Sequence, residues 1–265
     1  LYIAPGEEEG SNHVWRVDIN TGERTQLTDS TCVSTQDFDM SDYRCNQMLP
    51  VSASSSGGLA FVQVPYQTPD GKFIVEDVGE MVVVTDGGQS AFASSLKYIP
   101  KNMSWSANGE WILMASAVDH GSGKDLLAVS KLTGDECGWS NIDPRPVDYV
   151  DWSSRNGGEV VYSAAGDLWL VPLRTFNNPP GRCPKFELNK KIQLTSTGDQ
   201  EDRPQWLHFN DWIAFTSDSD SSLWLLDPAS LGAAPITDVS FPIKHSDWQS
   251  IADSTKARIK GSMKK

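Results

Sequence analysis

Asp148-Tyr-Val-Asp-Trp-Ser-Ser-Arg-Asn-Gly-Gly158, followed by Glu159-Val-Val-Tyr-Ser163 and Gly166-Asp-Leu-Trp-Leu-Val171, is the stretch that decides the fold. It holds three short apolar runs, and a fourth, Lys191-Ile-Gln-Leu-Thr195, follows an insert at residues 174–189. The breaks at Asn156-Gly157-Gly158 and Ala164–Asp167 favour tight hairpins, because Gly and Asn accept positive φ at little steric cost. We therefore predict a four-stranded antiparallel meander.

The chain repeats this meander. The pattern apolar-Trp-Ser-turn-apolar recurs at Met103–Met114, Val150–Tyr162 and Pro204–Thr216 and, in part, at Pro50–Val62 and Ser246–Ser250. Extended runs with bulky side chains occur at Val14–Val17, Met81–Val84, Leu126–Val129, Leu168–Val171 and Leu223–Leu226. A Leu-Thr or Ile-Thr pair closes some units, at residues 27–28, 194–195 and 236–237. Repeats of roughly 40–50 residues are typical of propellers. We predict an all-β fold, a single β-propeller of four-stranded antiparallel blades.

The two ends of the repeat pattern complement each other. The chain opens on Leu1–Pro5, which corresponds to the second strand of a four-stranded unit. The last strand that corresponds to the first of a unit lies near His245–Ser250. We predict five blades in a ring that the C-terminal strand closes by completing the N-terminal blade, which leaves no exposed sheet edge. Six blades remain an alternative, because Thr68–Lys72 is a turn signal followed by the apolar Phe73–Val75. The propeller is expected to span residues 1–250, and residues 251–265 to form a basic C-terminal tail.

Composition limits the partners. The chain has 265 residues, 38% of them hydrophobic, and a net charge of −13. This charge repels nucleic acid and anionic membranes, whereas cationic partners and divalent metals remain compatible with it. The sequence has no run of about 18 apolar residues, so it predicts no membrane span. The chain opens inside an apolar run without Met, so we expect a mature or trimmed product.

Four cysteines are present, Cys32, Cys45, Cys137 and Cys183, and none of them is in a CxxC pair. That spacing disfavours a structural zinc site. Two disulfides, Cys32–Cys45 and Cys137–Cys183, would agree with an exported protein. Four free thiols are the alternative.

The repeats resemble the WD40-like repeats of TolB-type β-propellers. Their pattern is W-S-x-D-G-x-x-I-x-F-x-S, then a D-I-Y/W-V strand, then a terminal L-T, which Asp151–Thr195 and Trp206–Trp224 match best. The resemblance implies a propeller and, by analogy with TolB, a periplasmic protein that binds a lipoprotein partner. TolB resembles a six-bladed propeller with an extra α/β domain, whereas this sequence shows five units and no such domain. Related propellers also occur in prolyl-oligopeptidase-type enzymes, whose hydrolase domain this sequence lacks.

Motifs for catalysis are missing from the sequence: it has no G-x-S-x-G, no P-loop and no H-E-x-x-H. Carboxylates flank the first strands of three blades, at Asp148, Asp151, Glu201, Asp202 and Asp247. Three of them, Asp151, Asp202 and Asp247, are candidate Ca²⁺ ligands, because first strands line a propeller channel and Ca²⁺ prefers six to eight oxygens. The alternative is that Asp before Trp-Ser binds local backbone. The same three carboxylates would serve a glycosidase if two or three of them lay close together in the channel and one had a raised pKa.

Tryptophans fall at equivalent first-strand positions, Trp105, Trp152, Trp206 and Trp248, and are predicted to pack between blades. Trp139 is the candidate for a sugar-stacking loop residue. The four His residues, His13, His120, His208 and His245, are scattered and are expected to be surface or packing residues. We expect a non-enzymatic, TolB-like scaffold that binds a protein or another ligand outside the cytoplasm, with Ca²⁺ as a candidate cofactor. A carbohydrate-binding or glycoside-hydrolysing propeller is the alternative.

Overall fold

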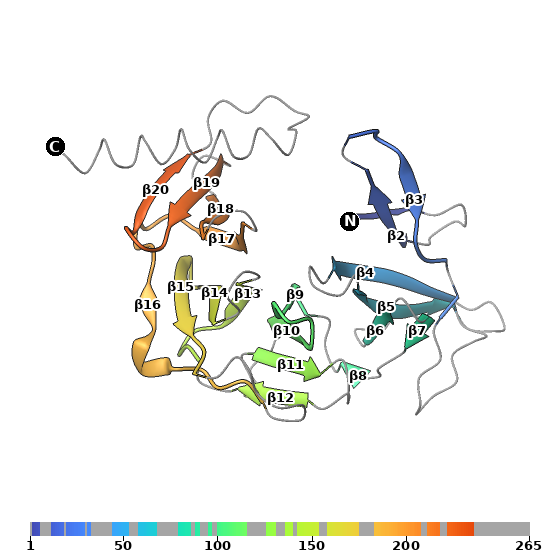
Figure 1. Ribbon diagram of the computed structural model, residues 1–265, viewed down its shortest axis with the longest axis horizontal. Helices are drawn as coiled ribbons and strands as arrows, with labels where there is room; N and C mark the ends of the chain where they lie inside the picture. Colours follow the sequence, from blue (N-terminus) through green and yellow to red (C-terminus); the bar gives the residue numbers. More distant parts are fainter. Residues whose placement is uncertain are drawn as a thin grey trace. The chain divides into compact units, whose positions relative to one another are not determined.

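The computed structural model describes residues 2–5, 12–18, 20–29, 31–32, 44–52, 58–67, 79–85, 88–90, 95–96, 100–115, 126–130, 136–139, 142–153, 158–174, 183–207, 211–217 and 222–235. They belong to two compact units. The first comprises Leu1–Asn141 with Asn178–Cys183, and the second Ile142–Asn177 with Pro184–Lys265. Each unit is built from antiparallel sheets whose strands follow one another in chain order (Figure 1).

The first unit contains three sheets. The first sheet consists of β1 (Tyr2–Pro5), β2 (Asn12–Val17) and β3 (Arg24–Gln26). The second consists of β4 (Arg44–Ser52), β5 (Leu59–Gln67), β6 (Gly79–Thr85) and β7 (Gly88–Ser90), with β8 (Ser95–Leu96) also paired to β6. The third consists of β9 (Met103–Trp105), β10 (Trp111–Ala115), β11 (Leu126–Ser130) and β12 (Glu136–Trp139).

The second unit contains two four-stranded sheets. One consists of β13 (Val147–Trp152), β14 (Glu159–Ala164), β15 (Asp167–Pro172) and β16 (Ile192–Gln193), with the 3-10 helix η1 (Leu188–Lys190) before β16. The other consists of β17 (Glu201–Trp206), β18 (Ile213–Ser217), β19 (Ser222–Asp227) and β20 (Gly232–Pro235).

These sheets confirm the predicted all-β fold of antiparallel meanders, with five sheets among the described residues. One expectation needs correction, because Trp139 lies in β12 rather than on a loop. The first sheet has three strands in the described part of the chain. The strand predicted to complete it, His245–Ser250, and the candidate extra hairpin, residues 68–78, lie outside the described residues, as does the tail.

The Trp-Ser-turn motif has a local physical basis that the turn after β9 shows. The buried Ser106 Oγ accepts hydrogen bonds from the backbone N–H of Trp111 at 3.0 Å and of Glu110 at 3.2 Å. Ser106 also donates to Asn108 Oδ1 at 2.7 Å, and Gly109 adopts φ 66°. The serine thus satisfies turn N–H groups that would otherwise lack partners, and the glycine supplies the left-handed conformation.

The hairpin between β14 and β15 also turns as predicted. Ala165 and Gly166 both have positive φ, 53° and 87°, which is the two-residue geometry that suits the twist of the strands. A Cβ on Gly166 would lie 3.3 Å from the backbone oxygen of Asp199. The backbone oxygen of Gly166 accepts a 2.8 Å bond from the N–H of Glu201. The glycine therefore permits the next sheet to approach this turn closely.

Two first-strand tryptophans, Trp105 and Trp206, pack between successive sheets, as predicted. Trp105 lies in a core cluster that joins the second sheet to the third and includes Val62 and Ile112. Trp206 lies in the cluster that joins the two sheets of the second unit and includes Leu170. Trp152 is 2% exposed. Trp248, the fourth member of the predicted set, lies outside the described residues.

A threonine hydroxyl connects one sheet to the next at two equivalent places. Thr195 Oγ1 accepts the N–H of Leu168 at 2.8 Å and donates to Glu201 Oε2, on β17, at 3.1 Å. In the first unit Thr28 accepts the N–H of Val14 at 2.9 Å and donates to Gln47 Oε1, on β4, at 3.4 Å. The repeated Leu-Thr ending thus marks a hydrogen bond to the following sheet.

Both cysteine pairs favoured in the sequence are disulfides in the structure. Cys32–Cys45 has a Cα–Cα distance of 5.1 Å, and its two residues are buried. Cys137–Cys183 has a Cα–Cα distance of 5.6 Å and ties the insert after β15 to β12. The base of this insert is ordered by pairing, because Arg174 N–H donates to the Lys185 backbone oxygen at 2.7 Å. The insert is therefore fixed in two ways, by the backbone hydrogen bond between Arg174 and Lys185 and by the disulfide of Cys183.

Replacing Cys32 and Cys45 together by alanine is expected to lower the free energy of unfolding by about 3 kcal/mol. The reason is that the bridge closes a loop and so reduces the conformational entropy of the unfolded chain. Urea unfolding of the oxidised proteins, followed by tryptophan fluorescence, measures the loss. An unchanged midpoint would show that the bridge does not restrict the unfolded chain in this way.

Candidate functional site

The first strands of the two sheets in the second unit, β13 and β17, carry the predicted site residues. Both strands are irregular: the register shifts between Val147 and Tyr149 in β13, and between Asp202 and Gln205 in β17. The β17 irregularity contains Arg203 and Pro204, and a proline without an N–H is suited to a bulge. Arg203 has φ 52° and an exposed side chain. The bulge therefore turns a cation outward from an otherwise regular strand.

Hydrogen bonds and a cation–π contact connect four residues of these sheets, which we call the Tyr149 cluster: Tyr149, Ser163, Asp202 and Arg203. The buried Ser163 Oγ accepts the N–H of Tyr149 at 3.2 Å and donates to Asp202 Oδ1 at 2.8 Å. The guanidinium carbon of Arg203 lies 5.6 Å from the centre of the Tyr149 ring, within cation–π range. One candidate residue, Asp202, thus belongs to a cluster that spans both sheets.

Asp151 has a different environment. Its Oδ2 accepts the backbone N–H of Trp206 at 2.6 Å, across the interface between the two sheets. This is the backbone-binding alternative considered for Asp before Trp-Ser, although the N–H belongs to the following sheet rather than to the local turn. An ionised carboxylate makes such a bond stronger than a neutral acceptor would. Asp151 therefore helps to hold β17 against β13.

The structure brings Asp151 and Asp202 to neighbouring strands, and Asp247 lies outside the described residues. No group of three or more His, Cys, Asp or Glu side chains with metal-binding spacing occurs in the described part of the chain. One oxygen of each described candidate already accepts a hydrogen bond. The Ca²⁺ hypothesis for Asp151, Asp202 and Asp247 stays a prediction.

A second polar group, around Asp143, is one that sequence reasoning missed. The side chain of Asp143 is fully buried and accepts bonds from Arg145 Nε at 2.7 Å, Lys191 Nζ at 2.8 Å and Tyr162 OH at 3.0 Å. Arg145 and Lys191 also lie over the Trp169 ring, at 4.6 and 4.7 Å from its centre. No spacing in the sequence signals this group, because Asp143 and Lys191 are 48 residues apart.

The charge state of Asp143 follows from these contacts. Burial alone would raise the pKa of its carboxyl, but hydrogen bonds from Arg145, Lys191 and Tyr162 outweigh burial and hold the pKa at about 2, below the usual 3.8. Asp143 is therefore ionised at neutral pH. With two cations and a phenol already bound to it, it is suited to holding the sheet together rather than to exchanging protons.

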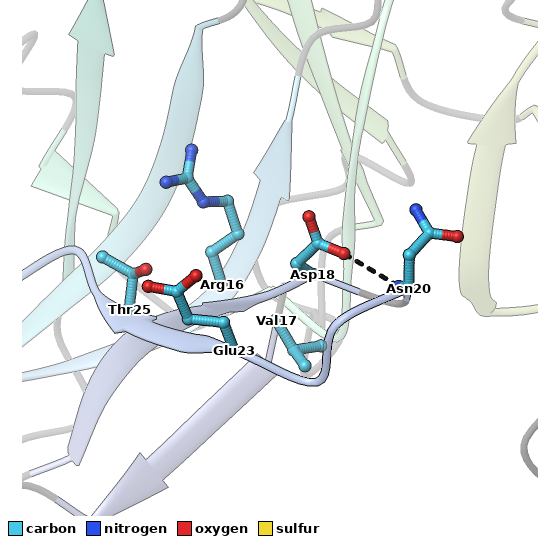
Figure 2. A pocket seen from close by; sticks show the side chains of 6 residues that line it. All are labelled: Arg16, Val17, Asp18, Asn20, Glu23 and Thr25. Atoms are coloured by element: carbon cyan, nitrogen blue, oxygen red, sulfur yellow. Dashed lines mark hydrogen bonds between the residues drawn. The ribbon is translucent and has the colours of Figure 1, made fainter.

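The first unit has a hollow of about 560 Å³ on the β2–β3 hairpin, lined by Arg16, Val17, Asp18, Asn20, Glu23 and Thr25. Figure 2 shows these side chains around the hairpin turn, with Asp18 bonded to Asn20. The N–H groups of Thr21 and Asn20 hold the pKa of Asp18 below its usual value. Its charged and amide side chains are all exposed, so the hollow is a turn surface without a buried polar group.

The other singled-out residues divide into two groups. His13 is buried, 2% exposed, and its Nδ1 lies 3.1 Å from Gln47 Oε1, which is the packing role that was expected. His120, His208 and His245 lie outside the described residues. No helix among the described residues has the length and apolar character to cross a bilayer.

Solved structures match this chain at low identity. A nidogen/laminin complex matches with 7% identity and a TM-score of 0.56, over 88% of this chain and 77% of that one. An oligogalacturonate lyase in complex with manganese matches with 11% identity and a TM-score of 0.50, over 89% of this chain and 63% of that one. This chain thus spans less than two thirds of the length of that enzyme. A putative TolB from Agrobacterium tumefaciens matches with 11% identity and a TM-score of 0.45, over 84% of this chain and 87% of that one.

No protein-family model matches the sequence, and no curated protein gives a significant match. At such identities a structural match shows the fold alone. Together with the repeated antiparallel meanders, the nidogen/laminin and lyase matches support the predicted β-propeller fold.

Proposed function

We propose that this chain is a non-enzymatic binding scaffold, periplasmic or secreted, that holds a protein partner on the loops of one propeller face. The observation that carries this proposal is the use of the first-strand carboxylates. Asp151 binds the backbone of Trp206 at 2.6 Å, and Asp202 binds Ser163 at 2.8 Å. A hydrolase would use such groups as a proton donor and a nucleophile or base, whereas here each connects two sheets.

The setting outside the cytoplasm is supported by the two disulfides, Cys32–Cys45 and Cys137–Cys183. Disulfides persist in oxidising compartments and are rare where glutathione keeps thiols reduced. Protein binding is supported by the nidogen/laminin match, since that structure is a complex of proteins. A rigid set of sheets with variable connections is also a common basis for recognition by loops.

A pair of substitutions tests the scaffold against the enzyme. Asp151→Asn keeps an acceptor for the Trp206 N–H, so the stability loss should be about 1 kcal/mol. The native protein, Asp151→Asn and Asp202→Asn should all show no turnover on a panel of polysaccharides and aryl glycosides. A hydrolysis or elimination that the native protein catalyses and Asp151→Asn abolishes would overturn the scaffold function. Binding is then measured with immobilised protein and purified extracytoplasmic proteins.

The second candidate function is a carbohydrate-binding or glycoside-cleaving propeller. It is supported by the match to a lyase that acts on oligogalacturonate and that was solved with manganese. Here Asp151, Asp202 and Asp247 would be the carboxylates that hold a divalent cation. If these carboxylates bind a divalent cation, adding Ca²⁺ or Mn²⁺ to metal-free protein should raise its melting temperature. The Asp202→Asn variant should not show that rise.

A further inference from the structure

The Tyr149 cluster contains a residue whose backbone conformation has no evident structural benefit. Arg203 has φ 52°, a region that costs a residue with a Cβ about 1–2 kcal/mol. It also precedes Pro204, and a residue before proline is restricted towards extended conformations. Glycine would fit this position with less strain. Strained positions of this kind concentrate at functional sites, where the surrounding structure holds them in place.

The charge of Arg203 is uncompensated within the described part of the chain. No described carboxylate lies within ion-pair distance of its guanidinium, and its contact there is the Tyr149 ring. Stacking on an aromatic ring orders a guanidinium and leaves its N–H groups free for an oxyanion. A planar carboxylate accepts two parallel bonds from such a group. Arg203 thus has the properties of an anion-binding residue that is already oriented.

Asp202 restricts which anion fits. Ser163 occupies one of its carboxylate oxygens, and no described residue binds the other, Oδ2. The carboxylate of Asp202 would repel a ligand that brought only carboxylates. A ligand with a hydroxyl beside its carboxylate satisfies both groups, because the hydroxyl donates to Asp202 while the carboxylate accepts from Arg203.

We propose that the Tyr149 cluster binds an acidic sugar, a uronic acid residue, with its carboxylate on Arg203 and a neighbouring hydroxyl on Asp202. Tyr149 is a positioning residue that holds the guanidinium. The proposal does not require a protein partner, and sugar binding is measured without one, so either proposal can fail without the other. An acidic peptide such as triglutamate lacks the hydroxyl donors and is the occupant that Asp202 disfavours.

Isothermal titration of the full chain with trigalacturonate tests the site. The native protein should bind it, and should bind neither maltotriose, which lacks the carboxylate, nor triglutamate, which lacks the hydroxyls. Arg203→Gly should weaken the affinity for trigalacturonate tenfold or more, while the melting temperature stays the same or rises. Arg203→Lys should also bind less tightly, because an ammonium cannot make the paired bonds.

Arg24→Ala is the matched control, since Arg24 is an exposed arginine on β3 and its loss changes the net charge equally. It should leave the trigalacturonate affinity unchanged. The proposal is overturned if the native protein does not bind trigalacturonate, if Arg203→Gly binds it as well as the native protein, or if triglutamate binds as tightly. A melting temperature that falls in Arg203→Gly would instead assign Arg203 a structural role and also reject the site.

Discussion

Replacing Asp143 by alanine is expected to lower the free energy of unfolding by about 3–5 kcal/mol, because breaking a buried ion pair leaves its partners without compensation. The substitution removes the acceptor for Arg145, Lys191 and Tyr162 at once. Tyr162 is fully buried, so its hydroxyl would have no water to replace the lost bond. Urea unfolding at pH 7 measures the effect.

The pH dependence gives a second measurement of the same group. The pKa of Asp143 is about 2 in the folded chain against a usual 3.8, so the folded state favours the ionised form. The corresponding stabilisation, about 2 kcal/mol from the size of the shift, is fully present above about pH 4. It is lost as the pH falls through 4 towards 2, and Asp143→Ala should lack this part of the acid sensitivity.

Asp167→Ala is the control for Asp143, because its carboxylate lies 3.9 Å from Arg145 and is partly exposed. An exposed pair of this kind contributes at most about 1 kcal/mol. Equal losses for Asp143→Ala and Asp167→Ala would mean that the buried contacts do not determine the stability of this sheet.

Replacing Trp206 by alanine is expected to destabilise the protein by about 3–5 kcal/mol, as for other buried tryptophans. The side chain is 6% exposed and fills the cluster between the two sheets of the second unit, with Val161, Leu168 and Ile213. Its indole N–H has no hydrogen-bond partner among the described residues, so the loss would come from packing. The backbone N–H that binds Asp151 is retained in the variant.

Calorimetry or urea unfolding measures this loss, and Trp206→Phe provides the comparison because it keeps an aromatic ring and should recover much of the stability. Leu231→Ala is the surface control, since Leu231 is 52% exposed. Its effect should stay within about 0.5 kcal/mol. A Trp206→Ala protein as stable as Leu231→Ala would show that the sheets do not depend on this packing.

Local patterns explain which parts of the fold could be predicted. The turns at Asn108-Gly109 and Ala165-Gly166 and the apolar strands between them are set by neighbouring residues, so the sequence displays them directly. The beginning of β4 has no such local signal, because Arg44–Gln47 are mostly polar and owe their strand to pairing with β5. Tertiary pairing overrides local preference in such a segment.

The candidate site was predictable only in part for the same reason. Asp151 and Asp202 stood out because they flank repeat motifs, but their partners, Trp206 and Ser163, are 55 and 39 residues away. Arg203 gave no signal, because its conformation depends on a register shift between β17 and β18. Charge, repeat and turn chemistry can be read along the chain, whereas contacts across sheets require the fold.

The threonine bonds between sheets also determine where this chain can be divided. Thr195 follows the last strand of one sheet, but its hydroxyl donates a hydrogen bond to Glu201 on the next sheet. Thr28 likewise donates to Gln47 on the next sheet. A fragment that stopped at the last strand of a sheet would therefore leave its final threonine without that acceptor. A fragment designed to keep this bond includes the first strand of the following sheet, so its boundary is offset by one strand from the sequence repeat.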